Sequence, residues 1–207
     1  MNIVERDYMI LRELDRWRFC LGRHIKMLTD FEGVRACDRR LKKLVEAGYI
    51  ERKKILYGIP SLYTLTHKGK VLLQVPLRKD KIPPEQILHS IAVIDTAIYF
   101  SKVRKLKSII TEKQLHKNDG FGVRKHQPDF VISVGKKTLC VEVELTLKSI
   151  KRIEQNIESN FMNYDYQIWV IPNRELKINK VINTAKEKYT GIYIIHYEAI
   201  KKYINSS

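Results

Sequence analysis

The pattern of the first 75 residues changes from helical to extended at a single glycine, and this restricts the fold more than any other feature. Apolar side chains recur at the spacing of one helical face in residues 3–19, 21–28 and 34–47, with charged side chains between them. Gly48 follows the third range and suits the left-handed conformation that ends many helices. The sequence therefore predicts three helices, of which the third ends at Gly48.

A β hairpin is predicted directly after Gly48. Two β-rich runs flank Gly58-Ile59-Pro60, which supplies the turn. Thr66 then has a side chain suited to a helix N-cap, so a closing helix is expected after it. Three helices, a two-stranded wing and a further helix form a winged helix-turn-helix, and we assign residues 1–75 to such a domain.

The third predicted helix has one apolar face and one strongly basic face. We expect its buried face to carry Val34, Cys37, Leu41, Leu44 and Val45. A winged helix places its third helix in the major groove of DNA and its wing against the neighbouring backbone. The candidate DNA-binding residues are the cations of this helix and of the wing: Arg35, Arg39, Arg40, Lys42, Lys43, Arg52, Lys53 and Lys54. Two alternatives to DNA binding stay open. In one the cations contact only solvent, and in the other the winged helix serves as a protein-docking or dimerisation module.

The chain as a whole is strongly basic. Its 39 Lys and Arg oppose 23 Asp and Glu, which gives a net charge of +16. The first 75 residues hold 16 basic and 9 acidic side chains, and the remainder holds 23 and 14. Such a charge favours a polyanionic partner, because neutralising phosphates releases counterions. We expect double-stranded DNA as this partner, although a basic soluble protein without one has the same composition.

The sequence predicts a cytoplasmic protein that has no membrane partner. No apolar run approaches the ~20 residues that a membrane-spanning helix needs. Charged residues interrupt the segment in which a signal peptide would have its apolar region. The three cysteines, Cys20, Cys37 and Cys140, are widely spaced and have no zinc-ligand spacing, so we expect them to be reduced and structural.

A second domain is predicted after a linker. Residues 76–84 combine charges with Pro83-Pro84, which cannot continue a helix. Residues 85–207 then carry helices and strands in the order of an α/β domain with a central mixed sheet. The expected helices cover 85–104, 148–162, 174–189 and the C terminus from about Glu198, and the expected strands cover 107–111, 129–134, 137–145, 166–171 and 191–196.

Three carboxylates are expected to meet in this second domain. Alternate residues of a strand share a face, so Glu142 and Glu144 lie on one face of the predicted strand 137–145. Asp129 begins the preceding strand, and a tight turn at Gly135-Lys136 brings it close to both. Such hard oxygen ligands suit Mg²⁺ or Mn²⁺. The alternative is a solvent-facing strand in a fold that lacks this chemistry.

The order of Pro128-Asp129, a hairpin and Glu142-Val143-Glu144 resembles the PD-(D/E)xK nuclease superfamily. The resemblance implies an α+β chain in which a restriction-endonuclease-like domain follows the winged helix. It implies further that Asp129 and Glu142 ligate a metal that activates water for attack on a phosphodiester. The third position of the motif is usually Lys but here is Glu144, and Lys148 on the next predicted helix is a candidate for the missing cation.

A narrower resemblance covers about residues 5–170. The stretch HSIAVIDTAIYF, which contains His89, Val93 and Asp95, resembles the helix that opens the second domain in the replication-relaxation family of plasmid and mobile-element proteins. PDFVISVGKKTLCVEVELT resembles the hairpin of that family. The resemblance implies a role in plasmid replication, mobilisation or DNA topology, with plasmid replication or mobilisation proteins as partners.

Functions of different classes stay open at this point. The first is a metal-dependent DNA endonuclease or nickase that the winged helix targets. The second is a non-catalytic replication or transcription regulator whose degenerate nuclease fold serves for dimerisation or backbone binding. A third is recognition of branched or nicked DNA by both basic domains. The oligomeric state stays open: a homodimer could pair through the helix at 85–104 or through the C-terminal helix, but neither carries a heptad seam.

Overall fold

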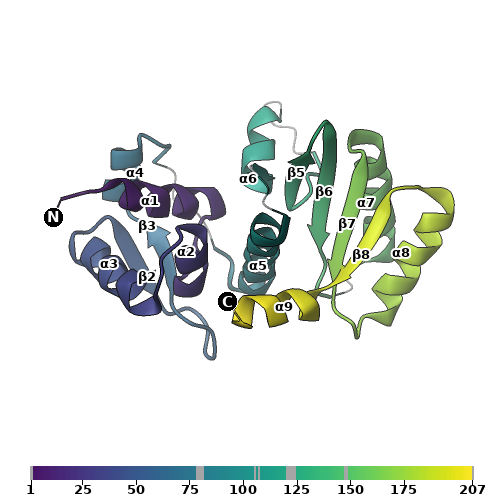
Figure 1. The fold of residues 1–207 in the computed structure, drawn as a ribbon. Helices are drawn as coiled ribbons and strands as arrows, with labels where there is room; N and C mark the ends of the chain where they lie inside the picture. Colours follow the sequence, from purple (N-terminus) through teal and green to yellow (C-terminus); the bar gives the residue numbers. More distant parts are fainter. Residues whose placement is uncertain are drawn as a thin grey trace. The chain divides into compact units, whose positions relative to one another are not determined.

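The computed structural model describes residues 2–77, 82–104, 106, 108–119, 125–146 and 149–206. Contacts along the backbone divide the chain into two compact units, Met1–Ile94 and Asp95–Ser207 (Figure 1). Residues 78–81 of the predicted linker lie outside the described residues. The boundary between the two units falls within the helix that follows this linker.

The first unit consists of helices and a three-stranded antiparallel sheet with the strand order β1-β3-β2. The predicted helices, hairpin and closing helix are present. The structure adds β1, which has two residues and is too short to show a sequence pattern. In chain order the elements are α1 (Glu5–Trp17), β1 (Cys20–Leu21), α2 (Gly22–Leu28), α3 (Val34–Glu46), β2 (Ile50–Lys53), β3 (Leu62–Leu65) and α4 (His67–Leu73).

Two predicted helix boundaries are confirmed by their hydrogen bonds. Gly48 has φ +76°, and the N–H groups of Gly48 and Tyr49 donate to the carbonyls of Val45 and Leu44 at the end of α3. These two bonds form a Schellman motif, which satisfies carbonyls that a helix end leaves unpaired. Thr66 caps α4, because its hydroxyl accepts the Gly69 N–H at 3.2 Å.

The predicted buried face of α3 needs one correction. Cys37, Leu41 and Leu44 are buried, whereas Val34 is 59% exposed. At 3.6 residues per turn, Val34 lies at the edge of the stripe that the three buried residues define. The apolar stripe of α3 is therefore narrower than the sequence predicted.

The second unit has a five-stranded mixed sheet with the order β4-β5-β6-β7-β8. β4, β5 and β6 are antiparallel, and β6, β7 and β8 are parallel. The chain is therefore α+β, with the central mixed sheet that the sequence predicted. The elements are α5 (Ile87–Arg104, after a 3-10 turn at Pro84–Gln86), β4 (Ile109–Thr111), α6 (Glu112–Leu115), a 3-10 turn (His116–Asn118), β5 (Phe130–Val134), β6 (Lys137–Val143), α7 (Ile150–Asn163), β7 (Tyr166–Ile171), α8 (Leu176–Lys188), β8 (Ile192–His196) and α9 (Tyr197–Ser206).

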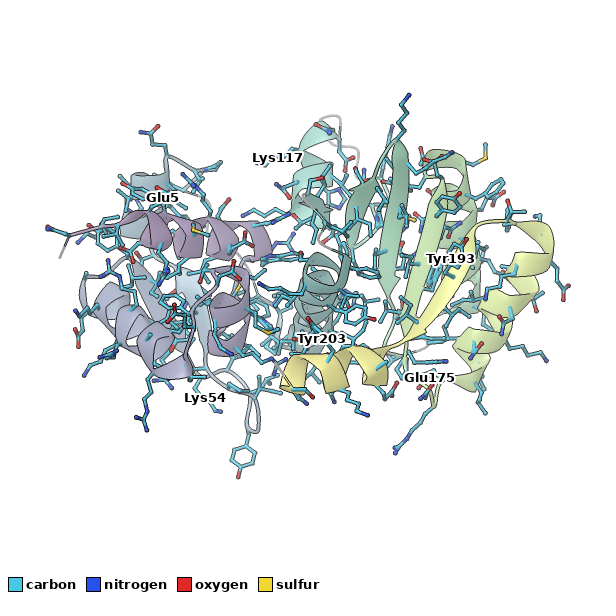
Figure 2. The ribbon with its side chains drawn as sticks, in the orientation of Figure 1. Glu5, Lys54, Lys117, Glu175, Tyr193 and Tyr203 are labelled. Carbon is cyan, nitrogen blue, oxygen red and sulfur yellow. The ribbon has the colours of Figure 1, made fainter. Side chains whose placement is uncertain are left out.

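Helices cover both faces of this five-stranded sheet (Figure 1). α7 and α8 pack an apolar cluster that includes Ile157, Ile182 and Trp169 against one face. α5 and α9 lie on the other face, where the ring of Tyr203 meets that of Tyr99 at 5.3 Å between centroids (Figure 2). A central strand between two helical layers is buried on both sides, so a polar side chain on it must find a partner inside the protein.

Two predicted segments of the second unit differ in the structure. The segment after β4, for which the sequence predicted neither a helix nor a strand, begins with α6. The reason is local, because the Gln114 side chain accepts the Thr111 N–H at 2.9 Å and so caps the helix. The strand predicted over 137–145 ends at Val143, which places Glu144 just beyond it.

The three cysteines lie in the interior of the protein and form no disulfide. Burial, followed by the charge of Asp38, raises the pKa of Cys37 to about 11, so its thiolate is scarce and its reactivity low. Among the described residues, no helix combines the length and the apolar character that crossing a membrane requires.

Candidate functional site

The outer face of α3 presents a cluster of cations. Arg35, Arg39, Lys42 and Lys43 are all exposed on this helix. Their positions recur at the spacing that places them opposite the buried Leu41. The structure therefore brings four of the five predicted α3 cations onto one solvent-facing surface, which we call the basic face.

Arg40 has a different environment. Its Nε donates to Asp7 Oδ1 at 2.5 Å, and its Nη2 donates to the other carboxylate oxygen of Asp7. Asp7 is fully buried and also accepts the Val4 N–H at 2.8 Å. A bidentate pair of this kind is strong and geometrically specific. The Arg40 guanidinium thus joins α3 to the start of α1.

A surface groove of about 740 Å³ runs between the start of α1 and the basic face of α3. Arg6 lies at its edge with its guanidinium 4.8 Å from the centre of the Phe31 ring, a cation–π contact. Arg6 belongs to α1, and no sequence pattern linked it to the cations of α3. The groove is lined by Val4, Glu5, Arg6, Phe31, Ala36, Arg39, Arg40, Lys42, Lys43 and Glu46.

The predicted wing cations are placed on and after β2. Arg52 is exposed, whereas Lys53 forms an ion pair with Glu51. Lys54 donates to the carbonyl of Ile59 across the loop that joins β2 and β3 (Figure 2). Tyr57 is fully exposed in this loop. Of these three cations, Lys53 and Lys54 are engaged within the hairpin, and Arg52 is exposed.

In the second unit, the structure brings Asp129 and Glu142 onto one face of the sheet. Asp129 directly precedes β5, and Glu142 is the second-last residue of β6. The pairing of Phe130 with Val141 sets them on neighbouring strands, on the face that α7 covers. Asp129 Oδ2 accepts the Val143 N–H at 2.7 Å, which fixes its carboxylate beside β6.

Glu142 is only 8% exposed and has two polar partners. His126 Nε2 and Asn160 Nδ2 each lie 2.9 Å from Glu142 Oε1. Burial raises the pKa of Glu142, and the negative charge of Asp129 adds to this, against the hydrogen bond from His126. For His126, burial opposes the charged ring, but the hydrogen bond and charge of Glu142 outweigh it and raise the pKa.

Glu144, the third carboxylate of the prediction, lies just beyond the end of β6. Glu144 is half-buried, and its N–H donates to Val170 O at 2.9 Å. Within the described part of the chain, no three or more His, Cys, Asp and Glu side chains are arranged to hold a metal ion. Lys148 lies outside the described residues. The structure thus places the carboxylates of Asp129 and Glu142 on neighbouring strands, and the role of Glu144 stays a prediction.

His126 and Asn160 were not predicted as site residues, although the sequence around each contains an indication. His126 stands three positions before Asp129 in HQPD. Asn160 lies on the buried face of α7, where Ile153 and Ile157 precede it at helical spacing. A polar residue on an otherwise apolar stripe requires a partner, and here that partner is Glu142.

The donor set of this site suits a hard divalent cation. Asp129 and Glu142 offer carboxylate oxygens, which Mg²⁺ and Mn²⁺ prefer. Asn160 is fully buried, and its Oδ1 has no hydrogen-bond partner among the described residues. Mg²⁺ commonly uses one or two carboxylates and keeps several waters, so two carboxylates with an orphaned amide oxygen are compatible with it.

The sequence profile of the replication-relaxation family matches residues 11–164. The chain belongs to this family. The matched range runs from α1 to the end of α7, so it includes both the basic face and the carboxylate pair. Membership of the replication-relaxation family indicates a role in the replication of plasmids or mobile elements. No curated protein and no solved structure matches the chain.

Proposed function

We propose that this replication-relaxation protein binds duplex DNA through the basic face of α3 and the groove beside it. The observation that carries the proposal is the gathering of Arg35, Arg39, Lys42 and Lys43 on one exposed surface, with Arg6 at its edge. Such a surface neutralises several phosphates at once, and the released counterions drive binding. Arg40 is not part of this surface, because its guanidinium is bound to Asp7.

The topology of the first unit supports a winged-helix role. The order α1, β1, α2, α3, β2, β3 and the antiparallel sheet β1-β3-β2 match the order expected of a winged helix. In such domains the third helix enters the major groove, which corresponds here to α3. The loop between β2 and β3, with Arg52 at its base and Tyr57 within it, then lies against the flanking backbone.

The test is the salt dependence of duplex binding by the full chain. Fluorescence anisotropy with a labelled duplex, repeated at several NaCl concentrations, gives the slope of log affinity against log salt. Arg39→Ala with Lys43→Ala weakens binding and lowers the slope by about one for each lost phosphate contact. Arg12→Ala is the matched control, since Arg12 is an exposed α1 cation paired with Glu5. Equal slopes for the double variant and the control would contradict the proposal.

A second candidate function is metal-dependent hydrolysis of a phosphodiester by the second unit. The observation that favours it is the placement of Asp129 and Glu142 side by side on neighbouring strands, one of them buried. A bound Mg²⁺ or Mn²⁺ would supply Lewis-acid stabilisation of charge on the phosphate oxygens. Hydrolysis adds one water: its oxygen bonds to phosphorus and one P–O ester bond breaks. One proton of the water goes to the departing oxygen, and the other stays on the new phosphate hydroxyl or is released to solvent.

In this candidate function the residues of the chain have separate roles. Asp129 and Glu142 hold the cation, and the β5–β6 pairing keeps their carboxylates in register. Glu144 occupies the position that is Lys in most PD-(D/E)xK nucleases, so the chain must orient the attacking water differently from those enzymes. This departure makes a non-catalytic, DNA-binding second unit the competing outcome.

Plasmid nicking distinguishes these outcomes. Supercoiled plasmid is incubated with the full chain and Mg²⁺ or Mn²⁺, in parallel with Asp129→Asn and Glu142→Gln. Conversion to open circles that both substitutions reduce to the level of a control without protein supports catalysis. Nicking that survives both substitutions comes from a contaminant, and absence of nicking assigns the second unit a non-catalytic role.

A further inference from the structure

Two side chains from different parts of the chain hold the Glu142 carboxylate. His126 and Asn160 reach it from different elements, one before β5 and one from α7, and both bind the same oxygen, Oε1. No hydrogen bond to Oε2 is found among the described residues. Two donors on one oxygen fix the rotation of the carboxylate, so that Oε2 has a defined direction.

The buried cluster of Glu142, His126 and Asn160 destabilises the fold unless a further partner binds its unsatisfied polar atom. Removing a carboxylate from water is expensive, and the cost is recovered only when its hydrogen bonds are satisfied. Asn160 is 0% exposed, yet only its Nδ2 is bonded and its Oδ1 is without a partner among the described residues. A buried polar atom of this kind points to an ion or a water as its partner.

We propose that Asn160 supplies a third oxygen to a divalent-cation site with Asp129 and Glu142, and that His126 is the positioning residue of this site. The inference rests on the metal-binding part of the second candidate function, but not on its catalysis. Oδ1 belongs to the same planar amide as Nδ2, so it lies one amide width from an atom that is hydrogen-bonded to Glu142 Oε1 at 2.9 Å. Two carboxylates balance the charge of a divalent cation, and a neutral amide oxygen adds a ligand without adding charge.

His126 acts through Glu142. Its Nε2 contact leaves the imidazole on the Oε1 side of the carboxylate. Partners of this kind orient a ligand, and their loss commonly lowers metal affinity about 10- to 100-fold. His116, by contrast, is bound by Asp119 and Glu112.

Calorimetric titration of Mn²⁺ into metal-stripped full-length protein tests the role of Asn160. Wild type is expected to bind Mn²⁺, and Asn160→Ala to bind it about 10- to 100-fold more weakly. Asn163→Ala is the matched control, because Asn163 is an exposed asparagine on the same helix whose Nδ2 donates to Ser159 O. Wild-type affinity in a folded Asn160→Ala protein overturns the proposal, as does wild type that binds no Mn²⁺.

A second variant keeps the test decisive if Asn160→Ala unfolds. Asn160→Asp preserves shape and an oxygen but adds a negative charge beside Glu142. Without metal this charge lowers the melting temperature, and Mn²⁺ is expected to raise it by more than in wild type. A melting temperature of Asn160→Asp that does not respond to Mn²⁺ overturns the assignment.

The role of His126 is tested by conservative rescue. His126→Ala is expected to lower Mn²⁺ affinity about 10- to 100-fold, and His126→Gln, which retains an N–H donor, to recover part of it. Equal affinities for the two variants, when both are folded in EDTA, overturn the positioning role. Nicking is measured on the same samples. Mn²⁺ binding that depends on Asn160 without any nicking supports this inference and rejects the nuclease activity.

Discussion

At the scale of single residues, two charged side chains of the first unit have roles that exposure alone does not reveal. Arg40 and Asp7 are 33 positions apart and form a bidentate pair in which Asp7 is completely buried. Asp7 also caps the start of α1 through the Val4 N–H. Because the pair is desolvated on one side, removing one partner leaves the other charge without compensation.

Replacing Asp7 with Ala is expected to lower the free energy of unfolding by about 3 kcal/mol, since it removes a buried ion pair and a helix cap together. Chemical denaturation monitored by circular dichroism measures this change. Glu5→Ala is the control, because the Glu5–Arg12 pair is exposed and contributes less than about 1 kcal/mol. Similar losses for the two variants would show that the Asp7–Arg40 pair does not stabilise the fold.

At the scale of elements, α4 packs so closely against the residue before β2 that only glycine fits at position 69. A Cβ on Gly69 would lie 2.2 Å from the carbonyl oxygen of Tyr49 and 3.1 Å from a methyl carbon of Leu65. Thr66 strengthens the same junction, because its hydroxyl donates to the carbonyls of Gly48 and Tyr49. The helix and the hairpin therefore approach each other through the backbone.

Gly69→Ala is expected to destabilise the chain by roughly 1–3 kcal/mol, because α4 must move away from Tyr49. Thermal unfolding compares it with Gly33→Ala, whose added Cβ meets nothing within 4 Å at a φ of −141°. The control is expected to lose less than about 1 kcal/mol. Equal melting temperatures for the two variants would show that the close approach at Gly69 does not position α4.

The junction of β6 and β7 predicts a dependence on pH. The Asp165 carboxylate binds Lys137 Nζ at 2.6 Å and the N–H of Thr138 at 2.9 Å. These bonds, the one from Lys137 first, lower the pKa of Asp165 from 3.8 to about 2. A lowered pKa means that the stabilisation is complete above pH 3.8 and is lost as pH falls through about 2.

Asp165→Asn should therefore flatten the acid limb of the stability curve. Melting temperatures of wild type and variant, measured between pH 5 and pH 2, are expected to converge as the pH falls, because wild type loses a contribution that the variant lacks. The side chain is exposed, so the effect is small. Parallel curves over this range would mean that Asp165 does not titrate with a lowered pKa in the folded chain.

At the scale of the whole molecule, the positive charge is spread over the entire sequence. The first 75 residues hold 16 basic and 9 acidic side chains, and the remainder holds 23 basic and 14 acidic ones. Long-range attraction to a polyanion depends on this total, whereas docking depends on the basic face of α3. Both contributions weaken with added salt, but only docking depends on particular α3 residues.

The Arg39→Ala and Lys43→Ala double variant is therefore expected to retain weak binding to DNA at low salt. Anisotropy at low NaCl is expected to show this residual affinity, with little preference among duplex sequences, and to lose it at moderate salt. The same variant without any low-salt binding would indicate that the second unit does not contact DNA.

Local patterns in the sequence determined most of the elements. Helical periodicity, Gly48 and Thr66 gave the helices and hairpin of the first unit, and β7 lies over the predicted residues 166–171. The proximity of Asp129 and Glu142 was also predictable, because a two-residue turn joins β5 to β6 and fixes their register. Boundaries were less accurate, since α6 depends on a single side-chain cap at Gln114.

Only the tertiary structure decided which polar groups meet across the chain. Arg40 with Asp7, His126 with Glu142 and Glu142 with Asn160 are separated by 33, 16 and 18 residues. Arg6 likewise reaches the groove beside α3 from another helix. Periodicity reports which face of an element is apolar, but partners on different elements depend on how those elements pack. The sequence alone thus determined the elements and one carboxylate pair, whereas packing decided that Arg40 is structural and that His126 and Asn160 hold Glu142.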